Sequence, residues 1–143
     1  MGINLNDSEI QQVFGEQNPN QYEAEAKARW GDTDAYKESA RRTSSYSKDD
    51  WLAVQAEQEA VLEMFMSAMQ AGLAVDSPEA MAAAEAHRAG INDRFYPCSY
   101  EMQTNLADMY LADARFTAYY DQHMDGLAKY VSEAIHANAI AKS

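Results

Sequence analysis

The sequence predicts an all-α domain, and three observations lead to that class. Proline and glycine are scarce, with three and six residues in a chain of 143. Alanine, glutamate, glutamine and methionine are plentiful, and these residues favour helices over strands. No stretch alternates apolar and polar residues for long enough to predict a β-strand. We therefore expect seven or eight helices and no sheet.

The bulk composition limits the kinds of partner. Apolar residues make up 47% of the chain and charged residues 24%, which is typical of a single globular domain. The formal net charge is −12 and the densest basic cluster, at 40–42, is short, so we expect no direct contact with nucleic acid. The chain has one cysteine, which excludes an internal disulfide and fits a reducing cytoplasm. We see neither a signal peptide nor an apolar run of membrane-spanning length, so we expect a cytoplasmic domain with no membrane partner.

Capping residues mark three short helices in the first third of the chain. Asparagine, aspartate and threonine cap helix starts, and glycine often follows helix ends. The expected starts are Asn6 or Asp7, Asn18 or Asn20, and Asp32 or Thr33, and the expected ends include Gly15 and Gly31. Large aromatic side chains, namely Tyr22, Trp30 and Tyr36, are the main anchors of these otherwise polar helices.

A long helix follows from residue 47 to about residue 72. Ser47 and Asp50 have the spacing of an acidic capping box, and Gly72 provides a stop. Apolar side chains recur along one face at helical spacing. They are Trp51, Val54, Val61, Leu62, Phe65, Met66 and Met69.

Capping residues also mark the starts of the later helices. Ser77 followed by Pro78 predicts a helix start, and this helix ends near Phe95. If Ser99 is the next N-cap, another helix starts at Tyr100. A short helix around 114–124 and a final helix around 125–142 complete the chain.

The aliphatic residues are unevenly distributed between two parts. Residues 1–46 have short helices and few aliphatic side chains, so little buried apolar surface offsets their loss of conformational entropy. Residues 47–143 hold most of the leucine, isoleucine, valine and methionine. We expect a stable core at 47–143 and a weaker lid at 1–46, which becomes ordered when something fills the space beneath it.

The sequence contains no recognisable catalytic or metal-binding combination. His87, His123 and His136 lie in separate predicted helices and share no ligand spacing, so we interpret them as surface or capping residues. There is no phosphate-binding glycine loop, nucleophile elbow or paired-carboxylate motif. We therefore expect no metal, no cofactor and no enzymatic activity.

Cys98 has two interpretations that the residues alone leave open. Just before a helix N-terminus, the helix dipole favours the thiolate, and Arg94 four residues earlier adds positive charge. In apolar surroundings, however, the same thiol would be buried and inert.

Aromatic residues and methionines also have two interpretations. They can fill a helical core, or they can line a cleft for a large apolar ligand, because tyrosine suits half-wet surfaces and methionine adapts to varied partners. The aromatic candidates are Tyr96, Tyr100, Tyr110, Phe116 and Tyr119. The methionine candidates include Met66 and Met102.

Four segments of the chain resemble a known family. They are "NPNQYEAEAKARWGDTDAYKESARRTSSYSKDDW", "EAMAAAEAHRAGINDRFYPCSYEM", "LADMYLADARFTAYYD" and "GLAKYVSEAIHANA". Together they are similar to the TipAS domain, the antibiotic-recognition domain of thiostrepton-responsive TipA regulators in the MerR family. The resemblance extends from about residue 3 to residue 141, and "RWGDTDAY", "SYSKDDW" and "CSYEM" are its most specific motifs.

The resemblance implies a fold, a ligand and a chemistry. The fold is all-α and globin-like, without haem, and the N-terminal helices fold over a cyclic thiopeptide held in a cleft against the C-terminal core. The cysteine of the family attacks a dehydroalanine of the antibiotic and forms a thioether, and Cys98 occupies the matching position. The resemblance also implies that the full-length regulator dimerises through a coiled coil outside this chain.

We therefore expect an antibiotic-binding effector domain of a transcriptional activator. The alternative is a stand-alone protein of the albicidin-binding type, which confers resistance by sequestering the drug. The expected ligand-binding residues are Cys98, Tyr100, Tyr96, Met102, Tyr110, Phe116, Tyr119, Trp30, Tyr36 and Met66.

Overall fold

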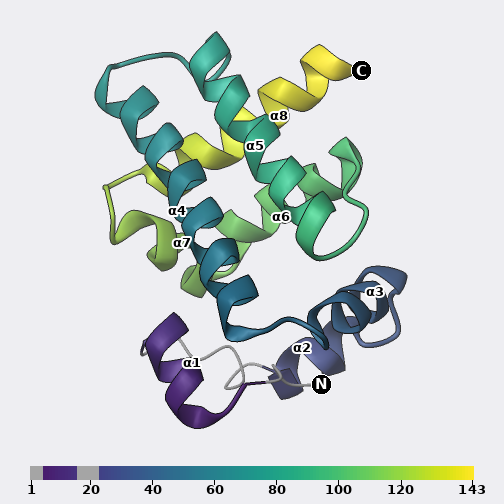
Figure 1. Cartoon of the computed structure of the whole chain (residues 1–143). Coiled ribbons are helices and arrows are strands. Elements are labelled where there is room, and N and C mark those ends of the chain that lie inside the picture. Colours follow the sequence, from purple (N-terminus) through teal and green to yellow (C-terminus); the bar gives the residue numbers. More distant parts are fainter. Residues whose placement is uncertain (1–4, 16–22) are drawn as a thin grey trace. The chain divides into compact units, whose positions relative to one another are not determined.

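The structure is a computed structural model that describes residues 5–15 and 23–143 (Figure 1). Within these residues it contains eight α-helices and no strand, which confirms the all-α prediction. The helices are α1 (Asp7–Phe14), α2 (Glu23–Trp30), α3 (Asp34–Thr43), α4 (Lys48–Gln70), α5 (Pro78–Arg94), α6 (Tyr100–Ala112), α7 (Ala114–Asp121) and α8 (Leu127–Lys142). The predicted anchor Tyr22 and the predicted caps Asn18 and Asn20 lie outside the described residues.

The predicted N-caps are confirmed where helices begin. The Glu9 amide donates to Asn6 Oδ1 at 2.8 Å, and the Asn6 amide donates in return to the Glu9 carboxylate, which closes a capping box on α1. Ser47 and Asp50 form the corresponding pair at α4, with the Ser47 amide 2.9 Å from Asp50 Oδ2. At α6, Ser99 Oγ accepts from the amide N–H of the third helical residue.

The chain forms two compact units, and α4 and α5 each contribute residues to both. The first unit comprises Met1–Glu57 and Gly90–Pro97, and the second comprises Gln58–Ala89 and Cys98–Ser143. This division describes packing. The boundary expected at residue 47 concerns stability in the absence of a ligand, and it stays a prediction.

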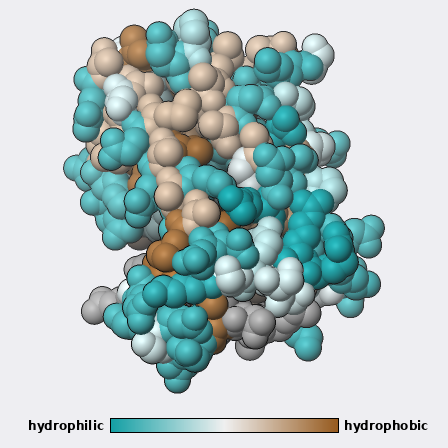
Figure 2. Space-filling view, in the orientation of Figure 1, coloured by the Kyte–Doolittle hydropathy of each residue, from teal (hydrophilic) through white to brown (hydrophobic). Residues whose placement is uncertain are grey.

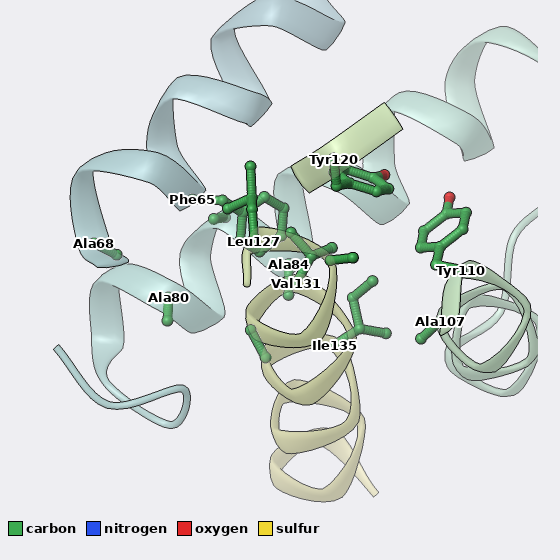
Figure 3. Close-up of a cluster of buried hydrophobic side chains, with 13 residues drawn as sticks. Phe65, Ala68, Ala80, Ala84, Ala107, Tyr110, Tyr120, Leu127, Val131 and Ile135 are labelled. Atoms are coloured by element: carbon green, nitrogen blue, oxygen red, sulfur yellow. The ribbon is translucent and has the colours of Figure 1, made fainter. Parts of the chain in front are cut away.

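The second unit is built around the N-terminal half of α8. Leu127, Val131 and Ile135 recur along one face of this helix and are fully buried. Figure 3 shows them directed toward side chains of α4, α5 and α6. Helix α5 contributes only alanines to this buried cluster, so its backbone can approach α8 closely. This core fixes the helices that carry the second unit's candidate site residues.

The first unit has a smaller aromatic cluster around Trp51. The Trp51 ring is 5% exposed and makes edge contacts with Phe14 and Tyr46, at centroid distances of 5.6 and 5.4 Å. The centre of the Phe95 ring lies 6.2 Å from the centre of the Trp51 ring. The Tyr46 hydroxyl donates to the carbonyl of Arg94 at 2.5 Å. These contacts connect the start of α4 to the end of α5 within this unit.

The surface has both hydrophilic and apolar areas. On the face drawn in Figure 2, hydrophilic residues cover much of the surface, and a weakly hydrophobic area lies in its upper middle part. None of the helices in the described part of the chain is long and apolar enough to cross a membrane.

Candidate functional site

Cys98 lies in the second unit, directly before the N-cap of α6. Its side chain is 1% exposed, and its Sγ lies 3.7 Å from the carbonyl oxygen of Ser99. Burial raises the pKa of the thiol, and the positive charge of Arg88 only partly opposes this effect. Of the two interpretations of Cys98 that the sequence left open, this geometry favours the buried thiol, because desolvation outweighs the nearby positive charge. Arg94, which was expected to help, instead pairs with Glu57 in the first unit at 2.6 Å.

Arg88 on α5 is the charged residue that reaches the cysteine segment. Its Nη1 donates to the carbonyl oxygen of Cys98 at 2.7 Å. Its guanidinium carbon lies 4.5 Å from the centre of the Tyr100 ring, a cation–π geometry. The same guanidinium binds Glu85 one turn earlier, through Nε at 3.1 Å and Nη2 at 2.7 Å. One arginine thus binds residues on both sides of Ser99.

Glu85 collects hydrogen bonds from three different helices. Besides Arg88 of its own helix, its carboxylate accepts from the Tyr100 hydroxyl of α6 at 2.9 Å and from Asn138 Nδ2 of α8 at 3.0 Å. Burial raises the pKa of Glu85, but the hydrogen bonds from Arg88, Asn138 and Tyr100 outweigh burial, and the net pKa is lowered. Glu85 is therefore an anion held between α5, α6 and α8.

A second polar group lies deeper, between α5 and α6. Gln103 is fully buried, and its Nε2 donates to the carbonyl of Ala84 at 2.8 Å and to His87 Nδ1 at 2.9 Å. His87 Nε2 lies 3.1 Å from the Tyr110 hydroxyl. Burial lowers the pKa of His87 to about 4. The interpretation of His87 as a surface or capping residue is therefore wrong, whereas His123 is exposed and His136 Nε2 lies 2.8 Å from Asp108 Oδ1 near the surface.

The aromatic candidates of the second unit divide between core and surface. Tyr110 is 9% exposed, and its ring lies 5.8 Å from the half-buried ring of Phe116 and 5.1 Å from the ring of Tyr120. Tyr119 is 42% exposed and contacts the edges of Tyr120 and His123. Tyr110 and Phe116 therefore lie together, and Tyr119 joins them through Tyr120.

The two methionine candidates of this unit are half-buried. Met66 of α4 packs against the buried cluster of the second unit. Met102 lies in the first turn of α6, and its amide N–H donates to Ser99 Oγ at 3.0 Å. The structure thus places Met66 at the core and Met102 near Cys98 along the chain.

Three of the candidates lie in the first unit. Trp30 is the last residue of α2 and is half-buried, with the Arg29 guanidinium carbon 4.4 Å from the ring centre. Tyr36 is a half-buried residue of α3, and its amide binds the N-cap Thr33. Tyr96 is half-buried after the end of α5, with its amide N–H donating to the carbonyl of Ile91.

Sequence reasoning missed several polar residues of the second unit. Glu85 and Arg88 have the i, i+3 spacing of an ion pair on a predicted helix, and this signal was available. The buried residues of α6 are Gln103, Ala107 and Tyr110, whereas Leu111 on the same helix is 47% exposed. Among the described residues no cluster of histidine, cysteine, aspartate or glutamate could hold a metal ion.

The chain matches one family model, described as the TipAS antibiotic-recognition domain, over residues 22–138. It is 49% identical over 140 residues to the HTH-type transcriptional activator TipA of Streptomyces coelicolor, and equally to that of Streptomyces lividans. These alignments cover 98% of this chain and 55% of each activator, so the chain spans about half the length of these relatives.

Two solved structures are similar to it. One is TipAS of Streptomyces lividans in complex with the thiopeptide nosiheptide, with a TM-score of 0.91 and 47% identity over 99% of both chains. The other is the antibiotic-binding domain of a TipA-class multidrug resistance transcriptional regulator, with a TM-score of 0.60 and 44% identity over 65% of this chain and 99% of that one. The chain therefore belongs to the TipAS antibiotic-recognition domain family.

Proposed function

We propose that this chain is the antibiotic-binding domain of a TipA-like transcriptional activator and that it binds thiopeptide antibiotics. The observation that carries the proposal is the likeness, along almost the whole chain, to a domain solved with nosiheptide bound. An enzyme would need a catalytic constellation, and this family is defined by recognition of antibiotics. We therefore assign it stoichiometric capture of a ligand.

We assign DNA binding and dimerisation to other parts of the regulator. We expect the regulator to act in the cytoplasm. The related activators are about twice as long as this chain, and their names include a helix-turn-helix. A net charge of −12 disfavours contact with a phosphate backbone. This chain would therefore sense the antibiotic, and the resulting change of conformation would bias the activator as a whole.

We further propose that Cys98 forms a thioether with a dehydroalanine of the antibiotic. The thiolate sulfur adds to the terminal carbon of the alkene, a C–S bond forms, the C=C π bond breaks, and the adjacent carbon takes up a proton. No leaving group and no oxidant is involved. Because the thiol is 1% exposed and its pKa is raised by burial, non-covalent binding has to precede the addition and bring the alkene within reach.

The non-covalent contacts are assigned to the predicted aromatic and methionine residues. Such side chains suit a large apolar ligand with a few polar groups. In the second unit they are Tyr100, Met102, Tyr110, Phe116, Tyr119 and Met66, and in the first unit they are Trp30, Tyr36 and Tyr96. Tyr110 is the most buried of this group, so we expect it to act through its neighbours more than by direct contact.

Calorimetry and intact mass spectrometry test the two parts of the proposal separately. Wild type and Cys98→Ala are titrated with nosiheptide and with thiostrepton. The intact mass of each protein is then measured after incubation with each antibiotic. We expect binding by both proteins and an added antibiotic mass on wild type alone. Absence of binding by wild type would overturn the antibiotic-binding function, whereas binding without any adduct would overturn only the thioether.

A further inference from the structure

The carbonyl of Cys98 is held by a side chain of another helix. Arg88 Nη1 donates to it at 2.7 Å, and Arg88 belongs to α5, ten residues earlier in the chain. Hydrogen bonds from charged donors are the stronger ones, so this contact restrains the backbone at the cysteine. The side chain of Cys98 is buried, with an exposed fraction of 1%.

Arg88 is itself held in place by Glu85. Two of its nitrogens, Nε and Nη2, bind the same carboxylate oxygen, which leaves Nη1 to reach Cys98. The other carboxylate oxygen binds Tyr100 and Asn138, and Asn138 is 2% exposed on α8. The orientation of Arg88 is thereby fixed by three helices rather than by its own flexible stem.

Tyr100 is also engaged by this pair. Its hydroxyl donates to Glu85 and its ring lies under the Arg88 guanidinium, 4.5 Å from centroid to carbon. Both the polar tip and one face of this predicted ligand-binding residue are therefore occupied within the protein. Arg88 therefore contacts the residues on both sides of Ser99, the cap of α6, and Glu85 binds the one that follows it.

We propose that Glu85 and Arg88 are positioning residues that set the exposure and the ionisation of the Cys98 thiol, Arg88 by holding the Cys98 carbonyl and Glu85 by orienting and neutralising Arg88. Together with the segment 98–100 we call them the Cys98 clamp. The proposal rests on the proposed function, because the reaction that the clamp controls is the addition of this thiol to an electron-poor alkene. The clamp keeps the sole cysteine from reacting with unselected small electrophiles, so that capture depends on a ligand able to loosen segment 98–100.

The two members of the clamp act on different quantities. Arg88 restrains the backbone, so its loss exposes the thiol and raises the rate at which the thiolate reacts. Glu85 compensates the charge of Arg88, so its neutralisation leaves an uncompensated cation near the sulfur and favours the thiolate. A purely structural role would change the stability of the protein without moving the pH midpoint of the reaction.

Acrylamide is a suitable probe, because it is a small neutral alkene that adds to a thiolate by the same chemistry. The rate of its addition to Cys98 is followed by intact mass from about pH 6 to about pH 10, a range that spans the ordinary ionisation of a thiol. For Arg88→Met we expect the alkaline plateau rate to rise about tenfold, because thiol reactivity follows access. For Glu85→Gln we expect the midpoint to fall by about half a pH unit, because Arg88 loses the compensating charge. Arg88→Lys keeps the charge and one donor, and it is expected to return the plateau toward that of wild type.

Glu38 and Arg41 on α3 provide a matched control. They form the same i, i+3 pair, with Arg41 Nε 2.8 Å from Glu38 Oε1, but Arg41 is 71% exposed and lies in the first unit. Arg41→Met is therefore expected to leave both the plateau and the midpoint at the wild-type values. Circular dichroism and the melting temperature establish that each variant is folded.

A folded Arg88→Met with the plateau rate of wild type would overturn the clamp. If Arg88→Met does not fold, Glu85→Gln decides the question, and an unchanged midpoint in that variant would overturn it equally. The antibiotic takes no part in this measurement. Calorimetry of wild type with nosiheptide tests the proposed function on its own, so the failure of either idea can be recognised without the other.

Discussion

At the scale of single residues, the hydrogen bonds of Gln103 determine the protonation of His87. The carbonyl of Ala84 can only accept, so the amide nitrogen of Gln103 has to face it, and the same nitrogen donates its second hydrogen to His87 Nδ1. Nδ1 is therefore unprotonated, and Nε2 carries the hydrogen that is donated to the Tyr110 hydroxyl. A second proton on this ring would leave Nδ1–H facing a donor in a buried site. This arrangement leaves Gln103 Oε1 without a partner among the described residues.

This neutral ring predicts a pH-dependent loss of stability. The pKa of His87 is about 4 in the folded protein against an ordinary value of 6.5, so the unfolded chain binds more protons between these values. Its contribution to stability is complete above pH 6.5, decreases as the pH falls, and by about pH 4 has lost about 3 kcal/mol. Urea unfolding of wild type and His87→Gln across this window measures it as the difference between the two proteins.

The comparison with His87→Gln separates this histidine from the carboxylates, which titrate in the lower part of the same window in both proteins. His123→Gln is the control, since His123 is exposed. Its stability should follow wild type at every pH. If wild type and His87→Gln have parallel stability curves between pH 4 and 6.5, the ring is not held neutral as we describe.

At the scale of helices, the N-cap of α6 lies at the end of the segment that carries Cys98. Ser99 Oγ accepts the amide hydrogen of Met102 at 3.0 Å, and the hydroxyl is on the surface. We expect Ser99→Ala to lower the free energy of unfolding by about 1 kcal/mol, and Ser99→Asp to retain most of it, because both serine and aspartate are good N-caps. Urea denaturation of the three proteins is the measurement. Equal losses in both variants would mean that the side-chain cap is not what stabilises this end of α6.

The buried alanines of α5 predict that a larger side chain at these positions destabilises the protein. Ala83 is fully buried against the core, whereas its neighbour Ala82 on the same helix is exposed. Ala83→Leu would force extra methyl groups into a closely packed site and should cost about 1–3 kcal/mol or more, while Ala82→Leu should change stability by less than about 0.5 kcal/mol. Thermal melts of the pair test this. Similar melting temperatures for the two leucine variants would contradict the close approach of α5 to its neighbours.

These two elements show what a sequence can predict and what it cannot. The start of α6 at Ser99 and the start of α5 after Ser77 follow from local capping chemistry, and both were predicted correctly. The burial of Cys98 and Gln103 and the half-buried position of His87 depend on which faces of α5, α6 and α8 meet, and the spacing of residues along one helix does not determine this. Gln103 is stabilised between a carbonyl and an imidazole that are distant in sequence, so no local sequence pattern predicts its burial.

At the scale of the whole molecule, burial is distributed unevenly among the helices. Helix α3 contains no buried residue, and its polar contacts are mainly ion pairs at the surface, such as Arg41 with Glu38. Helix α8 buries seven residues, including Leu127, Val131 and Ile135. An element with few buried apolar contacts opens at low free energy, whereas one at the centre of a core opens only with global unfolding.

This contrast predicts how antibiotic binding would affect hydrogen exchange. Without antibiotic, we expect the amides of α3 to exchange rapidly and those of α8 slowly, because only the latter are protected by a core. If residues 1–46 become ordered on the ligand, saturation with nosiheptide should slow exchange in α3 by at least about tenfold, since each factor of ten corresponds to about 1.4 kcal/mol of added protection. Exchange in the middle of α8 should change far less, because it is already limited by global stability.

Cys98→Ala provides the control for covalent attachment, and it should show the same protection of α3 if non-covalent binding is sufficient. Unchanged exchange of α3, in a sample that calorimetry shows to be saturated, would mean that this part of the chain gains no order from the ligand.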